Sequence, residues 1–406
     1  MMKKIGLAAL ILIVLISGGC WNKKEPNDLA LIDSIVYNKT QDGKYQVIVE
    51  FLNLSGSGKK TGAGGGGGEA SEKKSITLTA TGESYREAIA NIASSIEKTI
   101  YGGHNHVRFF TESAAKSDMA ATIDNLLRDH LTDETPLMVV IKGDNAEKIY
   151  ESSIGLADSV GAFIDRMQIT QQESSSMSVF VTTLNFFKDF FNDGKEPVTG
   201  VVQAVKSKSD TPASETDSKG AEDKDQLLYE GLAAFKGDKL VGFFNGSETR
   251  AYNFITGKIG VAIVTVPFEN SSVICEVTKA SSDVKTSIKD ESAAIDLEIK
   301  ADVRVIGCGA DVNPGDPSIM RQIEKAFNSY LLPQIAGAVQ KAQKDFSSDI
   351  FGFGMSVHEQ HPKDWQSIKK DWGRIFPEAT VKISVTSNVY QTSETKDSIL
   401  SEFTED

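Results

Sequence analysis

The chain has 406 residues, which is long enough for two or three domains and a well-buried core. Its formal net charge is −13 at pH 7, with 43 Lys and Arg residues against 56 Asp and Glu residues. Because nucleic-acid binding depends on basic side chains that neutralise phosphates, this charge argues against a nucleic-acid partner. It also argues against electrostatic attachment to anionic lipid.

Residues 1–19 have the order of a secretory signal peptide. Two lysines precede an unbroken apolar run, 5–16, which is too short to span a bilayer. Small residues follow, and then Cys20. A cysteine directly after the cleavage site is typical of a bacterial lipoprotein, so we predict that Cys20 carries a diacylglycerol. The lipobox pattern has Leu where this chain has Ser17, and the alternative is a plain cleaved signal or an uncleaved anchor.

Residues 20–150 are predicted to form an N-terminal α/β domain with the order β-β-β-α-β-α-β-α. Asp42-Gly43 between two apolar runs indicates a hairpin. The tract 55–74 is rich in Gly, Ser and Lys, cannot bury apolar area, and is expected to be a flexible loop. Ser84 and Glu87 have the spacing of a capping box that begins a helix. Strands are expected at 29–37, 45–54, 76–81, 107–110 and 137–141, and the longer helices at 85–100 and 112–131.

Two further α+β domains are predicted, a middle one over 151–258 and a C-terminal one over 259–392. Within the middle domain, 206–226 lacks apolar periodicity and is expected to be disordered. In the C-terminal domain, a helix from residue 318 is expected to be interrupted at Pro333. Residues 393–406 form an acidic tail. Strands are expected at 200–205, 231–235, 239–244, 260–268, 273–280, 295–306 and 379–390, a helix at 362–372, and a helix or strand at 180–191.

The fold class that follows is α+β, with three small domains that each have a mixed or antiparallel sheet and packed helices.

Beyond Cys20, only Cys275 and Cys308 remain, both in apolar, strand-like stretches. An oxidising exterior permits a disulfide between them. The simpler interpretation, which we favour, is two small buried side chains. Two cysteines are too few for a structural zinc site, which takes four ligands.

Several patterns approach a chemical motif without completing it. Gly62–Gly67 matches the letters of the dinucleotide fingerprint, but no apolar helix follows. His104 and His106 share a face if they lie on a strand, yet no third metal ligand is evident near them. His358 and His361 are one residue short of the zincin spacing. We therefore predict no cofactor, no metal and no enzymatic activity.

The start of the mature chain resembles that of a known family. The residues Cys20-Trp21-Asn22-Lys23-Lys24-Glu25 resemble the Cys-Trp-Asp/Asn-x-x-Glu start of the Ger(x)C spore germination lipoproteins, the C subunits of nutrient germinant receptors. Similar segments recur in the family's order at 234–236, 239–242 and 349–354, and at Pro362, Trp365 and Trp372. Ser17 and the acidic tail depart from the family pattern.

The resemblance implies a three-domain α+β protein anchored to the outer face of the spore's inner membrane. There it would work with a membrane-embedded A subunit and a transporter-like B subunit, with no catalytic residue. Two other classes of protein compete with this hypothesis, a solute-binding lipoprotein of a transporter and a tethered hydrolase.

Trp365 and Trp372 lie seven residues apart on one face of a predicted helix. For this pair, ordinary core packing competes with a partner-binding stripe.

Overall fold

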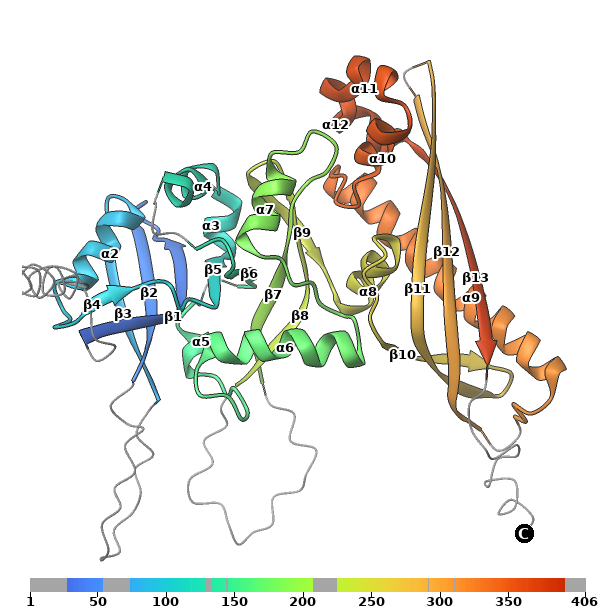
Figure 1. The fold of residues 1–406 in the computed structure, drawn as a ribbon, viewed down its shortest axis with the longest axis horizontal. Helices are drawn as coiled ribbons and strands as arrows, with labels where there is room; N and C mark the ends of the chain where they lie inside the picture. The colour runs from blue at the N-terminus through green and yellow to red at the C-terminus, as the bar shows by residue number, and fades with distance from the viewer. Residues whose placement is uncertain are drawn as a thin grey trace, which may run out of the picture.

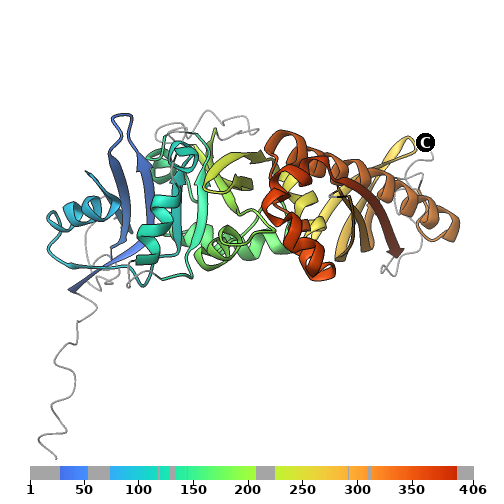
Figure 2. The ribbon, with the colours of Figure 1, turned by 90° about the horizontal axis from the view of Figure 1, so that it is seen from above.

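The strands of the described residues form two β-sheets that lie side by side along an elongated molecule (Figure 1, Figure 2). The computed structural model describes residues 28–53, 74–117, 119–128, 133–143, 145–206, 225–290, 292–309 and 312–390. The predicted signal peptide, Cys20 and the acidic tail lie outside these residues. So do nearly all of the Gly-rich tract and of the 206–226 connector.

The first sheet joins strands from the predicted N-terminal and middle domains. Its order is β3-β2-β1-β5-β6-β7-β8-β9, and β4 pairs with β1 off this path. The strands β1, β5, β6 and β7 are parallel, and the outer pairs are antiparallel. The bounds are β1 (Leu29–Lys39), β2 (Tyr45–Leu52), β3 (Ser75–Gly82), β4 (Thr99–Tyr101), β5 (Val107–Thr111), β6 (Leu137–Ile141), β7 (Val198–Val205), β8 (Gln226–Lys236) and β9 (Lys239–Phe244).

The structure thus has two sheets, where the sequence predicted one for each of three units. The pairing of β6 with β7 runs across the predicted boundary at residue 150. Three helices lie between these strands in the chain: α5 (Lys148–Glu151), α6 (Val160–Ser174) and α7 (Thr183–Phe190). Such a crossover hides a parallel pairing from local sequence patterns. The division into three domains stays a prediction.

Helices cover both faces of the first sheet. Because successive side chains of a strand point to opposite faces, every residue of β5 and β6 is buried. Phe110 packs with the helices of one face, whereas Phe109 packs with those of the other. The first group is α2 (Tyr85–Ala93), α3 (Glu112–Ser117), α4 (Met119–Arg128) and α7 (Thr183–Phe190), and the second is α5 (Lys148–Glu151) and α6 (Val160–Ser174).

The second sheet has the order β10-β11-β12-β13, and its last pair of strands is parallel. Its bounds are β10 (Ala262–Phe268), β11 (Ser271–Lys289), β12 (Ser292–Cys308) and β13 (Thr380–Tyr390). One face packs on the long helix α9 (Pro317–Lys341), and α8 (Gly246–Ile255) lies between the two sheets (Figure 1). The opposite face carries exposed, mostly polar side chains.

The helix α9 contradicts the predicted interruption at Pro333. The helix begins after the N-cap Asp316, as expected, and continues through the proline. Leu331 and Ile335 are buried on the two sides of Pro333. Packing of this face against the sheet therefore outweighs the missing N–H of the proline. In the described part of the chain, no helix is long and apolar enough to cross a membrane.

Short helices after α9 close the C-terminal part: α10 (Phe353–Gln360), α11 (Pro362–Ile368) and α12 (Trp372–Ile375). The side chain of Gln360 covers the free edge of β11. Its Oε1 accepts the N–H of Thr286 at 2.8 Å, and its Nε2 donates to the carbonyl of Val284 at 2.7 Å. An amide side chain thus satisfies backbone groups that no strand pairs in this region.

Candidate functional site

The segment from Asp349 to Gly354 is a sharp turn built around one buried carboxylate. Asp349 Oδ1 accepts the N–H groups of Gly352 and Phe353 at 3.0 and 3.1 Å. Its Oδ2 accepts the N–H of Gly354 at 2.8 Å and the indole N–H of Trp372 at 2.9 Å. Four donors therefore converge on a side chain that is 3% exposed. The carboxylate fixes the turn through three backbone hydrogen bonds, and the indole of Trp372 fixes the carboxylate to α12.

Burial raises the pKa of Asp349 to about 6, although the four hydrogen bonds act in the opposite direction. The cost of removing the charge from water is the larger effect. Since the carboxylate is wholly enclosed by its own turn and Trp372, it has no access to a substrate. We assign it a structural role.

Trp365 and Trp372 both belong to the core, as the simpler sequence interpretation expected. Their exposed fractions are 2% and 4%, and their rings meet edge to face with centroids 5.6 Å apart. Trp372 also packs against Phe376. No partner-binding stripe is formed by this pair, because both rings face inward.

The turn also joins the C-terminal part to the first sheet. The carbonyl of Asp349 accepts the N–H of Glu196 at 2.9 Å, and the carbonyl of Gly194 accepts the N–H of Met355 at 3.1 Å. A Cβ atom on Gly354 would lie 2.8 Å from the Cα atom of Gly194. The two backbones approach so closely only because both positions are glycine.

The two cysteines are free rather than paired. Cys275 is buried on β11, and burial raises its pKa to about 11. Cys308 is half-buried at the end of β12, and burial raises its pKa as well. A raised pKa keeps both groups as thiols at neutral pH, which makes them poor nucleophiles. The predicted lipidation site, Cys20, lies outside the described residues.

The two histidines that resemble a zincin motif make structural contacts. His358 stacks on Trp365 with ring centroids 5.9 Å apart, and His361 Nε2 lies 2.7 Å from the carbonyl oxygen of Thr286. His104 and His106, in contrast, lie beside a third potential ligand, Asp33. The sequence did not indicate Asp33 because it comes from β1, 73 positions before His106.

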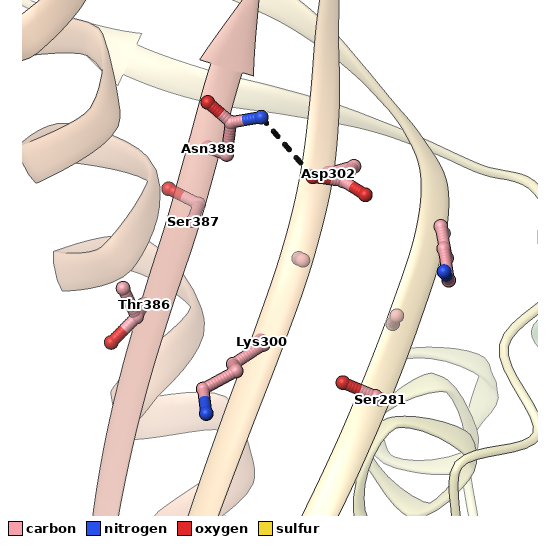
Figure 3. Close-up of a pocket in the computed structure, with 9 residues that line it drawn as sticks. Ser281, Lys300, Asp302, Thr386, Ser387 and Asn388 are labelled. Atoms are coloured by element: carbon pink, nitrogen blue, oxygen red, sulfur yellow. Dashed lines mark hydrogen bonds between the residues drawn. The ribbon is translucent and has the colours of Figure 1, made fainter.

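A groove of about 320 Å³ crosses β11, β12 and β13 (Figure 3). In Figure 3, Ser281, Lys300 and Thr386 lie on three neighbouring strands. Further along, Asn388 Nδ2 donates to Asp302 Oδ1 at 3.2 Å. The lining consists of lysines, short polar side chains and two alanines, Ala280 and Ala301.

Comparison with known proteins places this fold in a family. A model described as "Spore germination protein N-terminal domain" matches residues 22–204, and one described as "Spore germination B3/GerAC like, C-terminal" matches residues 230–393. The chain belongs to the GerAC family of spore germination proteins, the C subunits of germinant receptors. The resemblance that the sequence suggested is therefore confirmed.

Relatives and a solved structure extend along nearly the whole chain. In Bacillus subtilis (strain 168), "Spore germination protein KC" is 22% identical over all of both chains, and "Putative spore germination protein YfkR" is 24% identical over 92% of each. The crystal structure of the GerBC protein is 16% identical, with a TM-score of 0.52, and covers 87% of this chain and 96% of its own. This likeness shows that the fold is GerBC-like.

Proposed function

We propose that this chain is the lipid-anchored, non-catalytic C subunit of a spore nutrient germinant receptor. In this proposal Cys20 carries the acyl chains, and the folded part lies on the outer face of the spore's inner membrane. There it contacts the membrane-embedded A and B subunits and acts through protein–protein contacts.

The observation that carries the proposal is the position of the family match relative to the predicted anchor. The N-terminal family model begins at residue 22, two positions after Cys20, and the second model ends at residue 393. The whole family fold therefore lies downstream of the signal and lipidation pattern. An acidic chain needs such an anchor, because stable membrane binding requires two acyl chains or one chain with a basic patch.

The proposal is tested by expressing a tagged chain in sporulating cells together with its A and B subunits. We expect Cys20→Ala to abolish fatty-acid labelling and to release the chain from the membrane fraction or leave its signal uncut. The matched control is Cys308→Ala, which removes a half-buried thiol and should keep the label. Undiminished label in the Cys20 variant would contradict the anchor.

Co-purification and ligand binding separate the receptor subunit from the solute-binding alternative. We expect the A and B subunits to co-purify with the tagged wild-type chain. Nutrient germinants should leave the melting temperature of the purified chain unchanged. A specific ligand at 100 times its Kd adds about 2.7 kcal/mol to the stability of a protein. Such stabilisation without A and B would favour the solute-binding alternative.

A further inference from the structure

Asp33, His104 and His106 lie together at one end of the first sheet. The parallel pairing of β1 with β5 brings them there, since Ser34 is opposite Val107. The N–H of His106 donates to the carbonyl of Asp33 at 2.9 Å, and His106 Nδ1 lies 2.8 Å from Asp33 Oδ1. The rings of His104 and His106 are 4.7 Å apart. One ligand atom from each of the three side chains lies within 4.8 Å of the others.

The carboxylate of Asp33 is buried but sparsely hydrogen-bonded. Its side chain is 1% exposed, and His106 holds only its Oδ1. Oδ2 has no hydrogen bond of normal geometry among the described residues, and it lies against the first turn of α6, where a Cβ atom on Gly161 would meet it. A buried carboxylate with an unused oxygen retains the capacity to bind a cation.

Glu50, the neighbouring buried carboxylate, has hydrogen bonds to both of its oxygens. Its oxygens accept the hydroxyl groups of Ser34 and Ser75 and the N–H groups of Val160 and Gly161. Glu50 is therefore not available as a metal ligand. It does add a second acidic group beside Asp33. The imidazoles of His104 and His106 and the phenol of Tyr150 lie around the two carboxylates, and Asp165 acts on His106. His106 pairs with Asp33 as a cation when its imidazole is protonated.

We propose that Asp33, His104 and His106 bind a divalent transition-metal ion of the Zn²⁺ class. Imidazole with carboxylate favours Zn²⁺, Co²⁺ or Ni²⁺ over Mg²⁺ and Ca²⁺, which prefer oxygen ligands alone. Ligand atoms that hold a tetrahedral ion at about 2.0–2.2 Å lie about 3.3–3.6 Å from one another. His106 Nδ1 and Asp33 Oδ1, now 2.8 Å apart, therefore have to separate as the ion replaces their hydrogen bond, and the exposed His104 has to move toward them. Three protein ligands would leave a fourth position for water or for a partner's side chain.

Such an ion would fasten the segment before β5 to β1, the first strand of the folded part. It would also place a double positive charge beside the buried carboxylates of Asp33 and Glu50. Three protein ligands with an open position differ from a closed structural site, which has four. The site therefore holds a metal on a fold that already exists without it.

The test uses the full chain purified in detergent and dialysed against a chelator. Co²⁺ is titrated while visible absorption is recorded, and Zn²⁺ is then added as a competitor. We expect a Co²⁺ band that Zn²⁺ removes, and a rise in melting temperature with Zn²⁺. Absence of a Co²⁺ band in the wild-type chain would overturn the proposal.

Variants assign the site to these residues. His104→Ala should weaken Co²⁺ binding by more than about tenfold, since losing even a group that orients a ligand costs that much. Because His104 is exposed, the metal-free melting temperature should stay unchanged. Asp33→Asn should weaken binding similarly, and the exposed His358→Ala should keep full affinity. Unchanged affinity in either site variant, or lost affinity in the His358 variant, would overturn the proposal.

Discussion

The capping role of Asp349 explains why glycines stand at positions 352 and 354. The helix α10 has Gly352 at its N-cap, with a φ of +84°, and no side chain of its own caps it. Asp349 takes that role from three residues upstream, by accepting the first backbone N–H groups. Gly352 supplies the left-handed conformation, and Gly354 permits close approach. The signature Asp-Ile-Phe-Gly-Phe-Gly is therefore a folding motif.

The raised pKa of Asp349 predicts an unusual pH dependence. The folded chain binds this proton up to about pH 6, whereas an unfolded Asp releases it near its ordinary value of 3.8. Between these values the folded state binds more protons, so the stability that this group contributes falls as pH rises. We expect the stability difference between the wild type and Asp349→Asn to shrink by about 2 kcal/mol from pH 4.5 to pH 7.

Urea unfolding of both chains at the two pH values measures this change. Asp349→Asn should still be the less stable chain at pH 4.5. Its NH2 group brings two further donors to a site where four donors converge, whereas the protonated carboxyl group brings one. Comparing the two chains at each pH cancels the titration of all other groups. A gap that widens toward pH 7 would show that the hydrogen bonds outweigh burial.

At the scale of elements, the contact of Gly194 with Gly354 joins the loop before β7 to the start of α10. A Cβ atom on Gly354 would lie 2.6 Å from Trp372 Nε1 and 2.8 Å from the Cα atom of Gly194. We expect Gly354→Ala to destabilise the chain by about 1–3 kcal/mol through overpacking. The matched control is Gly373→Ala in α12, where a Cβ atom meets nothing within 4 Å.

The control should be neutral or stabilise the chain by up to about 1 kcal/mol, since Ala favours a helix over Gly. Thermal unfolding of the two variants beside the wild type provides the comparison. Equal stability of both variants would mean that the backbones separate at little cost. The junction would then be less rigid than its contacts indicate.

Local signals predicted elements well where neighbouring residues decide the structure. Ser84 caps α2 by accepting the N–H of Glu87, and Gly43 has the positive φ expected of an Asp-Gly turn. Asp316 caps α9. Each of these depends on residues within four positions of one another, so the sequence displays it directly.

The sequence did not predict features that depend on residues far apart in the chain. The strand β11 extends to Lys289, beyond the predicted end at 280, because its polar half is stabilised by pairing with β12. The meeting of Asp33 with His106 follows from a parallel strand pairing. The donors to Asp349 include Trp372, 23 positions away. No local pattern marks these contacts, since tertiary packing creates them.

At the scale of the whole molecule, one hydrophobic core connects the two sheets. A single cluster of buried side chains extends from Ile35 on β1 through Phe254 on α8 to Ile299 on β12 and Ile335 on α9. The turn around Asp349 belongs to this cluster through Phe353 and the two tryptophans. A cavity in this region is therefore expected to weaken the whole fold.

This continuity predicts how germination fails when the turn is damaged. Trp372→Ala removes a buried ring and the donor to Asp349, and a large-to-small change of this kind costs about 3–5 kcal/mol. We expect a lower amount of this subunit and of its receptor partners in spores. Germination should then slow at every nutrient concentration, while the half-maximal concentration stays unchanged.

The control is Leu156→Ala, at a side chain that is 97% exposed, which should leave the amount of the subunit unchanged. Immunoblots of the subunits beside germination rates across nutrient doses decide the matter. Normal subunit levels with a shifted dose response would instead assign Trp372 a direct part in sensing the nutrient.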